Sequence, residues 1–519
     1  MLGVAWKIYL LNRQAFPFNA DEAIVGLMAR HILAGERPLF FYGQAYMGSL
    51  DAALVAVVFR LMGISVAGIR LVQVLLYFLS TILFTSLIWG MTHSRAGVWA
   101  AGLFFALPVV NTTLYTTVSL GGYGEALLIG IVQLLLAFDF IKTGSRWRLI
   151  LWAFLTGLGL WVFGLTLIFS AASGILIAGS LRSNLQRGKR FSTFAVMTAA
   201  GLAGASPWLI TLDEKGLPTL LSELFGSAIA GGNTAIVQSV LLRIMNVFLF
   251  GPTVVLGIRP PWSVDPLAIA LLPFSICFWI IVGYHLIRRR SQSREEVPGV
   301  SMLGWITALT LLGLISTPFG GDPSGRYFLP LVIPLVAAGS IVLSEVRGRL
   351  RLFTWGLFGI TLIFQIAGTL QSARIPERGI TTQFDPVSWI DHRYDQELQS
   401  FLKRNDLTAG YTQYWVAYPL AFLSEEELIF LPWLPYHQDF RYTIRDDRYA
   451  AYREVVARSD SVAYITSHHP ALNALLEQRF EEGGVAYAVT QIGDYTVFYN
   501  LVPPTCPEDL RLPWQDALP

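Results

Sequence analysis

Residues 19–50 read NADEAIVGLMARHILAGERPLFFYGQAYMGSL, a polar and glycine-rich stretch set between strongly apolar ones. It carries two adjacent carboxylates, Asp21 and Glu22, soon after an apolar run at residues 1–11. The whole chain has 519 residues, of which 54% are hydrophobic and only 14% are charged. Charged residues usually make up about 25% of a water-soluble globular chain. We therefore expect an α-helical polytopic membrane protein with this stretch at the membrane surface.

The overall charge and the cysteines exclude several classes of function. The net charge of +2 gives no basic excess, and no Lys/Arg-rich run has interleaved aromatic residues, so we expect no nucleic-acid partner. Cys277 lies inside an apolar run and Cys506 near the C-terminus. Neither belongs to a cluster with metal-ligand spacing, and no internal disulfide is expected.

Apolar runs of membrane-spanning length follow the first loop. A bilayer core of about 30 Å needs roughly 20 apolar residues per helix. The run at residues 1–11 would span only about 17 Å at 1.5 Å per residue, and we interpret it as a first span that has lost its beginning. We expect residues 241–258 to be re-entrant or surface-lying. With the N-terminal run, about eleven spans are predicted, the other ten at residues 69–91, 96–112, 123–141, 149–163, 164–181, 192–211, 267–287, 301–317, 327–344 and 352–371.

The cations of the short loops predict the orientation, because cytoplasmic loops carry the excess of Lys and Arg. They fall on alternate connections, which we assign to the cytoplasm. The first outer loop (12–67), residues 213–266 and everything after Gln371 then face outward, in a cell inner (plasma) membrane. The cations are Arg95; Lys142, Arg146 and Arg148; Arg182, Arg187, Lys189 and Arg190; Arg288, Arg289, Arg290 and Arg294; and Arg347, Arg349 and Arg351.

The composition becomes that of a water-soluble domain near Thr381. We therefore divide the chain into a transmembrane domain, 1–375, and an extracytoplasmic α/β domain, 376–519. Five β-like runs, GYTQYW, ELIFLP, VAYITS, VAYAVTQ and YTVFYN, are interspersed with helix-like runs. The last two strands should form a hairpin around Gly493-Asp494. The aromatic runs YTQYWVAYP and LPWLPYHQDF suit core packing better than a sugar-stacking surface.

The acidic pair has two readings. Asn19 followed three residues later by Glu22 is a capping box, and acids in a first turn suit the helix dipole. A carboxylate at the membrane edge would also serve as a general base for an acceptor hydroxyl.

Two motifs resemble one enzyme family. The acidic pair, a helix ending in Gly and a GQ-x-Y-x-G-x-L turn are similar to the first outer loop of polyprenyl-phosphate-sugar-dependent glycosyltransferases. These form the protein mannosyltransferase and aminoarabinose transferase family of the GT-C superfamily. The second motif, GRYFLPLVIP, resembles the R-Y-x-x-P-x-x-P start of a late span. The matching residues are Asp21, Glu22, Ala23, Gly35, Tyr42, Gly43, Gln44, Tyr46, Gly48 and Leu50, and then Arg326, Tyr327, Pro330 and Pro334.

The resemblance implies a catalytic role for Asp21, as the base, with Glu22 beside it. The resemblance also implies that the polar and aromatic members of the two motifs bind substrate. These are Tyr42, Gln44, Tyr46 and Tyr327.

Three further charged residues each have a functional and a structural reading. Arg326 would hold the lipid phosphate through its guanidinium, or would snorkel to the interface. Arg30 would bind phosphate or form a salt bridge. Glu125 would line the site or be a first-turn acid facing water.

The remaining polar residues give weaker indications of a functional site. For Asp51, a helix cap is favoured over a second acid of the site. Asp322 is interpreted as a turn residue. His468-His469 lack ligand spacing, so a loop is favoured over a metal site. A divalent ion is an option that only Asp21, Glu22, Asp51 and Glu125 would assemble.

We therefore predict a membrane glycosyltransferase that takes a sugar from a polyprenyl-phosphate donor within the membrane lipid. The acceptor hydroxyl, whether on a protein, a lipid or a glycan, is left open. The main alternative is a non-catalytic transporter or flippase of lipid-linked sugars, which would need charges buried at mid-span. A scaffold that presents the α/β domain would leave the polar first loop without a purpose.

Overall fold

The computed structural model describes residues 1–184, 187–218, 236–292, 298–322, 324–374 and 379–518. Its internal contacts divide the chain into two compact units. The helical unit comprises Met1–Ala15, Ala45–Asp51 and Arg70–Arg374, and the mixed unit comprises Phe16–Gln44, Ala52–Ile69 and Ile375–Pro519. The predicted domain boundary at residue 375, Arg294 and part of the predicted outer segment 213–266 lie outside the described residues.

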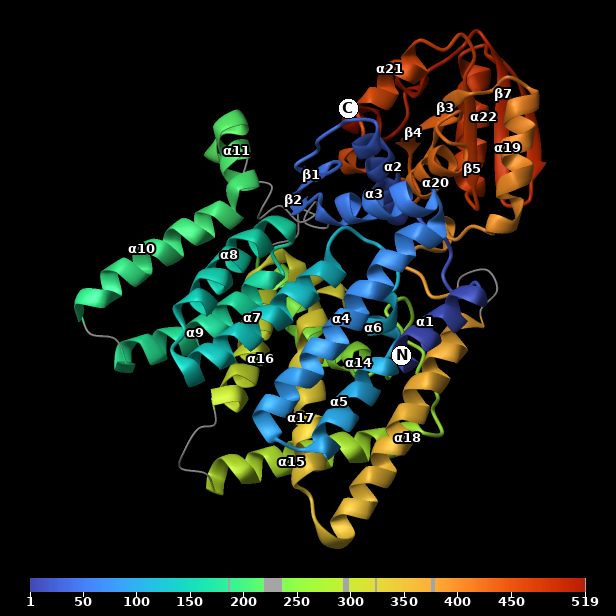
Figure 1. Ribbon diagram of the computed structural model, residues 1–519. Helices are drawn as coiled ribbons and strands as arrows, with labels where there is room; N and C mark the ends of the chain where they lie inside the picture. Colours follow the sequence, from blue (N-terminus) through green and yellow to red (C-terminus); the bar gives the residue numbers. More distant parts are fainter. Residues whose placement is uncertain (185–186, 219–235, 293–297, 323, 375–378, 519) are drawn as a thin grey trace. The chain divides into compact units, whose positions relative to one another are not determined.

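The helical unit is built of apolar helices packed pairwise. α7 contacts both α8 and α9, α8 contacts α10, α5 contacts α17, and α15 contacts α18 (Figure 1). One buried cluster joins Ala137, Phe140, Leu149 and Ile177. The helices are α1 (Leu2–Asn12), α4 (Val66–Thr92, whose first turn belongs to the mixed unit), α5 (Arg95–Ala106), α6 (Val110–Tyr115), α7 (Tyr123–Thr143), α8 (Arg146–Val162), α9 (Thr166–Asn184), α10 (Arg187–Gly204), α11 (Ser206–Lys215), α13 (Ile236–Met245), η1 (Asn246–Phe250), α14 (Gly251–Val255), α15 (Leu272–Gln292), α16 (Pro298–Ser316), η2 (Pro318–Gly321), η3 (Arg326–Leu331), α17 (Val332–Glu345) and α18 (Gly348–Ala373).

Five helical segments of the described chain are long and apolar enough to cross a membrane. They are Val66–Thr92, Tyr123–Thr143, Gly299–Ser316, Arg326–Glu345 and Gly348–Ala373, and each coincides with a predicted span. A sixth would be the pair Phe191–Gly204 and Ser206–Asp213, which is bent by 68° where we expected one span at 192–211. The multi-pass helical architecture is confirmed, and the count of about eleven spans stays a prediction.

A proline explains where one predicted span is broken. The run at 96–112 was expected to be continuous, yet α5 ends at Ala106 and α6 begins at Val110. Pro108 lies between them, and a proline disfavours the helical conformation of the residue before it. The turn predicted near Gly164 is present, because α8 ends at Val162 and α9 begins at Thr166.

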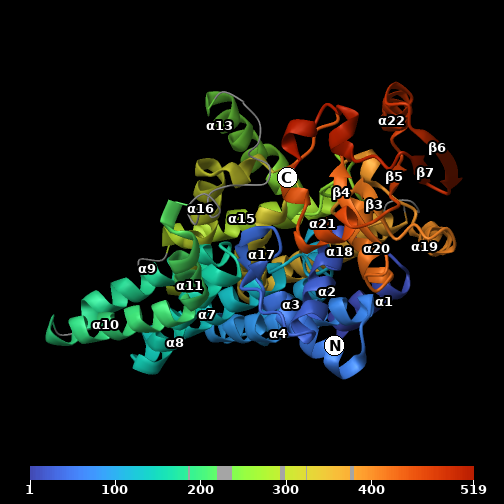
Figure 2. The same cartoon turned by 90° about the horizontal axis from the view of Figure 1, so that it is seen from above.

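The mixed unit contains a five-stranded sheet with strand order β4-β3-β5-β7-β6 (Figure 2). β3 pairs in parallel with β4 and β5, whereas β7 is antiparallel to β5 and β6. Its elements are α2 (Ala20–Leu33), β1 (Phe40–Phe41), α3 (Leu50–Met62), η4 (Pro386–Ser388), η5 (His392–Tyr394), α19 (Asp395–Arg404), β3 (Ala409–Gln413), α20 (Tyr414–Leu423), β4 (Ile429–Leu434), η6 (Ile444–Asp446), α21 (Ala451–Ala457), β5 (Ala463–Ser467), α22 (Pro470–Glu482), β6 (Ala486–Ile492), β7 (Tyr495–Val502), η7 (Pro507–Leu510) and η8 (Gln515–Ala517). β2 (Gln44–Gly48) and α3 each run from one unit into the other.

All five predicted strands of the C-terminal region are present, and β6 and β7 form the predicted hairpin, in which Ile492 pairs with Tyr495. One helix was not predicted. α20, YWVAYPLAFL, packs against β3 and β4 on one hand and against α2 of the first loop on the other. It is buried along nearly its whole length, so it shows no apolar stripe at helical spacing. This contact brings the first loop and the C-terminal segment into one unit.

Candidate active site

The two carboxylates of the first loop differ in their exposure to solvent. Asn19 caps α2, and its side chain accepts a hydrogen bond of 3.0 Å from the backbone N–H of Glu22. Glu22 is fully buried, whereas Asp21 is partly exposed. The predicted cap is therefore present, and within the pair Asp21 is the carboxylate that solvent reaches.

A tyrosine of the C-terminal segment holds Asp21. The Tyr414 hydroxyl, at the start of α20, donates a hydrogen bond of 2.5 Å to Asp21 Oδ1. Burial, and then the charge of Asp21, raises the pKa of Tyr414 well above its ordinary value. The phenol therefore keeps its proton and acts as a permanent donor to the carboxylate.

A second acid and an arginine lie around the same tyrosine. The guanidinium of Arg448 lies over the Tyr414 ring, 5.4 Å from its centroid. Asp446 is 6% exposed, and burial raises its pKa to about 7, with Arg448 opposing this shift and Asp21 adding to it. The Tyr418 hydroxyl fixes both residues, because it donates to Asp446 O (2.9 Å) and accepts from Arg448 N (2.6 Å).

Sequence reasoning missed Tyr414, Asp446 and Arg448. The separation between Asp21 and Tyr414 is 393 residues, so no local spacing connects them. The sole signal in the sequence is the aromatic run that contains Tyr414, and such a run suits core packing.

Gly43 of the first-loop motif lies against Arg448. Its φ is +68°, and a Cβ there would be 2.7 Å from Arg448 Cδ. Its carbonyl accepts a hydrogen bond of 3.5 Å from Arg448 Nη1. The turn thus needs glycine for its backbone conformation and for the close approach of the arginine. The neighbouring predicted residue, Gln44, is buried at the start of β2.

Tyr42 belongs to a polar network in the mixed unit. Its hydroxyl donates to Glu36 Oε2 (2.7 Å) and lies 2.9 Å from His31 Nδ1. Glu36 also accepts from the Tyr449 hydroxyl (2.6 Å), and the Tyr449 ring stacks on Tyr42 at 4.7 Å. Burial raises the pKa of Glu36, but the hydrogen bonds from Tyr449 and Tyr42 outweigh it, so the net shift is downward.

Arg30 and His31 both contact the Glu426 carboxylate. Arg30 Nη2 donates to Glu425 O (3.1 Å), and its Nε lies 3.7 Å from Glu426 Oε2. His31 Nε2 lies 2.8 Å from Glu426 Oε1. Of the two readings of Arg30, the structure shows the salt bridge, and phosphate binding stays a prediction.

In the helical unit, Arg326 lies among tyrosines. Its Nε donates to Asp322 Oδ2 at 2.5 Å, and its guanidinium lies 5.0 Å from the centroid of the Tyr327 ring. Tyr115 and Tyr123 are also within its electrostatic reach, and Tyr46 interacts in the same way with Tyr123 and Tyr327. Three predicted residues, Tyr46, Arg326 and Tyr327, are thus brought together. Asp322, predicted as a turn residue, accepts from Ser324 N (2.8 Å) as in an Asx-turn, and also pairs with the arginine.

Glu125 and Asp51 share a glutamine. Gln73 Nε2 donates to Asp51 Oδ1 (3.1 Å) and to Glu125 Oε1 (3.3 Å). Asp51 Oδ2 also accepts from the Ser119 hydroxyl (2.5 Å) and Gly121 N (3.2 Å). Both acids are almost fully buried, so Glu125 is not a first-turn acid that faces water.

A divalent ion does not fit these side chains. Over the described residues, no three His, Cys, Asp or Glu side chains converge as metal ligands would. The Asp51 oxygens already accept three hydrogen bonds, which leaves them poor ligands.

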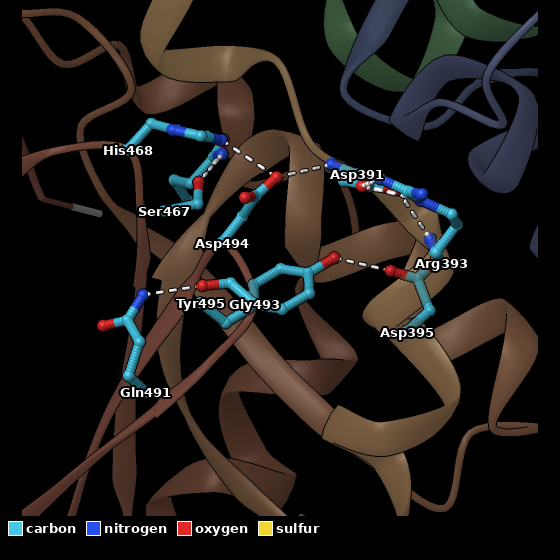
Figure 3. Close-up of polar contacts among 10 residues, drawn as sticks. Asp391, Arg393, Asp395, Ser467, His468, Gln491, Gly493, Asp494 and Tyr495 are labelled. Carbon is cyan, nitrogen blue, oxygen red and sulfur yellow. Dashed lines mark hydrogen bonds and ion pairs between the residues drawn. The ribbon is translucent and has the colours of Figure 1, made fainter. Parts of the chain in front are cut away.

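The paired histidines of the C-terminal segment have structural partners. His468 Nε2 lies 2.9 Å from Asp494 Oδ2, which also accepts a 2.7 Å hydrogen bond from Asp391 N (Figure 3). The neighbouring Tyr495 hydroxyl donates to Asp395 (2.6 Å), so the β6–β7 turn is anchored to residues 391–395. His469 caps α22 by accepting from Leu472 N (3.2 Å). These contacts agree with a loop rather than a metal site.

Comparison with known proteins identifies solved structures that have the same architecture. No protein-family model matches the chain, and no curated protein sequence is similar to it. The crystal structure of ArnT from Cupriavidus metallidurans bound to undecaprenyl phosphate superposes with a TM-score of 0.61 at 12% identity, over 96% of this chain and 97% of that one. The chain has the fold of ArnT. The resemblance to GT-C glycosyltransferases, inferred from two short motifs, is thereby confirmed for the fold.

Two other structures are less similar. The apo state of the same ArnT gives a TM-score of 0.58 at 12% identity, over 92% of this chain and 93% of that one. An oligosaccharyltransferase from Archaeoglobus fulgidus, in complex with Zn and sulfate, gives a TM-score of 0.46 at 14% identity, over 86% and 63% of the two chains.

Proposed function

We propose that this protein is a membrane glycosyltransferase that moves a sugar from a polyprenyl-phosphate donor to an acceptor hydroxyl. The observation that carries the proposal is the fold shared with ArnT over 96% of the chain, in a structure that holds undecaprenyl phosphate. The partly exposed Asp21 and the tyrosine-lined Arg326 supply side chains that this chemistry needs.

In this reaction Asp21 is the general base. Its carboxylate takes the proton from the acceptor hydroxyl as the oxygen attacks the anomeric carbon. The bond from that carbon to the phosphate oxygen breaks, and its electron pair leaves with polyprenyl phosphate. The new glycosidic bond therefore has inverted configuration. The leaving phosphate is stable as an anion and needs little acid assistance.

Arg326 holds the donor phosphate in the helical unit. A guanidinium offers a planar fork of N–H donors that matches a phosphate, and Asp322 fixes one side of it through Nε. The hydroxyls of Tyr46, Tyr123 and Tyr327 add neutral donors around the same charge.

The proposed reaction takes place on the outer face of a plasma membrane. The cations that alternate along the chain support this assignment, since they occur on every second connection. The mixed unit, which carries Asp21, then lies on the extracytoplasmic side.

The test uses the purified chain in proteoliposomes with a panel of undecaprenyl-phosphate-linked hexoses and pentoses. The readout is undecaprenyl phosphate released in the presence of bacterial envelope acceptors, separated by thin-layer chromatography. Asp21→Asn should reduce release about 10²- to 10⁴-fold, which is the usual contribution of a positioned general base to the rate. Asp460→Asn, at an exposed position of the same unit, is the matched control.

Three outcomes decide the proposal. Release by the wild type and by Asp460→Asn, with loss in Asp21→Asn, supports it. Undiminished release by Asp21→Asn rejects the assignment of the base. Movement of the intact lipid-linked sugar across the bilayer, without release from any donor, would show the transporter instead.

A further inference from the structure

We propose that the C-terminal α/β segment completes the catalytic base: Tyr414 positions the Asp21 carboxylate, and the pair Asp446 and Arg448 sets the charge around it. The inference rests on the proposed function and assigns to this segment a part in the reaction. All four residues belong to the mixed unit, so every contact used below lies within that unit.

Tyr414 is buried and closely packed. It is 3% exposed, begins α20 directly after β3, and has ring contacts with Trp415 at 5.0 Å and Tyr418 at 5.5 Å. α2 packs on the same helix, where Gly26 meets Phe422 so closely that a Cβ would lie 2.5 Å from the Phe422 ring. Hence both ends of the 2.5 Å bond between Tyr414 and Asp21 are carried by elements in direct contact.

The bond determines which oxygen acts. Tyr414 occupies Oδ1, so Oδ2 is the oxygen that receives the acceptor proton. A base held in one orientation makes the transfer more probable, and a displacement of about 1 Å can cost about 100-fold in rate. Tyr414 is thus a positioning residue, because it acts through Asp21 and not on the substrate.

Asp446 and Arg448 act through charge. Arg448 lies over Tyr414 and reaches Gly43 O of the first-loop turn, and Asp446 interacts electrostatically with both Arg448 and Asp21. The neighbouring acid, Asp447, is engaged elsewhere, since it accepts from Trp433 Nε1 (3.0 Å) and Arg453 Nε (2.8 Å). The aromatic residues around Asp446, Tyr436 and Tyr442, have pKa values raised by burial and stay neutral. Asp21 therefore shares its surroundings with the guanidinium of Arg448 and with Asp446, an acid whose pKa burial raises to about 7.

The first experiment measures kcat and KM for the lipid-linked donor with Tyr414→Phe, which removes one hydroxyl. We expect kcat to fall about 10- to 100-fold with KM changed less than about twofold. In the Asp21→Asn background the same substitution should have no further effect, because the two residues act as a unit. Tyr464→Phe is the control, since it deletes another buried hydroxyl bond, to Thr505 O (2.8 Å), away from Asp21.

The second experiment needs no turnover. A hydrophobic carbodiimide labels protonated carboxyls, and mass spectrometry gives the pH midpoint of labelling at Asp446. Asp21→Asn should move the midpoint to lower pH by removing a neighbouring negative charge, and Arg448→Gln should move it to higher pH. Asp460→Asn should leave it unchanged.

The outcomes separate the two proposals. An unchanged kcat in Tyr414→Phe, or an unmoved midpoint in Asp21→Asn, overturns the inference even if the wild type transfers sugar. If no donor is used by the wild type while the midpoints move as stated, the cluster exists and the proposed function fails.

Discussion

Replacement of Asp446 by Asn should remove a large part of the pH dependence of the mixed unit's stability. Burial raises the pKa of this carboxyl from its ordinary 3.8 to about 7 in the folded chain. The folded state therefore binds a proton that the unfolded state has released between these two values. Stability falls as pH rises through this window, because the unfolded state binds fewer protons there.

The magnitude follows from the two values. At about 1.36 kcal/mol for each pKa unit, the difference between 3.8 and about 7 corresponds to about 4 kcal/mol in total. About 1.6 kcal/mol of this stability has already been lost at pH 5, and roughly 3 kcal/mol more is lost between pH 5 and pH 8. For a unit of roughly 200 residues, at about 2–4 °C per kcal/mol, the wild-type midpoint should drop by about 6–12 °C more than that of Asp446→Asn.

The assay is thermal proteolysis of the full chain in detergent at pH 5, 6, 7 and 8, with peptides of the mixed unit quantified by mass spectrometry. Any pH-independent effect of the buried Asn amide cancels, because each variant is compared with itself across pH. Glu36, whose pKa is lowered, contributes at lower pH, where its stabilisation is lost on acidification below about 4.5. Equal midpoint changes in wild type and Asp446→Asn would refute the reasoning, and Asp460→Asn should behave as the wild type.

Two further substitutions test the placement of the predicted residues. Arg326→Lys keeps the charge but loses the planar fork of donors, so KM for the lipid-linked donor should rise about 10-fold or more while Lys142→Arg leaves it unchanged; an unaltered KM would contradict a phosphate site at Arg326. Gly43→Ala places a Cβ 2.7 Å from Arg448 Cδ at a φ of +68°, and should lower the proteolysis midpoint of the mixed unit by several degrees. Gly35→Ala is its control for backbone conformation alone, since φ there is +109° with open space around it, and equal effects of the two would show that contact with Arg448 is unimportant.

Local patterns of the sequence predicted the parts of the fold that local physics determines. Asn19 and Glu22 predicted the start of α2 because a cap depends on residues three positions apart. The alternating runs after residue 460 predicted β5, β6 and β7 and their hairpin. α20 was missed because its sequence is apolar and aromatic on all sides, and helical periodicity disappears in a fully buried helix.

The candidate site was only half predictable for a related reason. Asp21 and Arg326 belong to short motifs, so the sequence alone shows them, whereas most of the residues around them come from elsewhere in the chain. Tyr414 is 393 residues from Asp21, and the tyrosines near Arg326 include Tyr115 and Tyr123 from α6 and α7. Asp322 is four residues from Arg326, but its aspartate-proline-serine context predicted a turn, which it also makes.

The first-loop motif serves the C-terminal segment as well as the proposed chemistry. Asp21 accepts from Tyr414, Tyr42 stacks on Tyr449, and Gly43 lies against Arg448. A loop selected for catalysis alone would need the carboxylate but neither the stacked tyrosine nor the glycine. Because each of the three side-chain partners lies after residue 410, the motif also has the properties of a surface that seats the α/β segment. Asp21, the proposed base, and the residues that orient it are therefore parts of one connected arrangement, and substitutions in either should change the same kinetic constant.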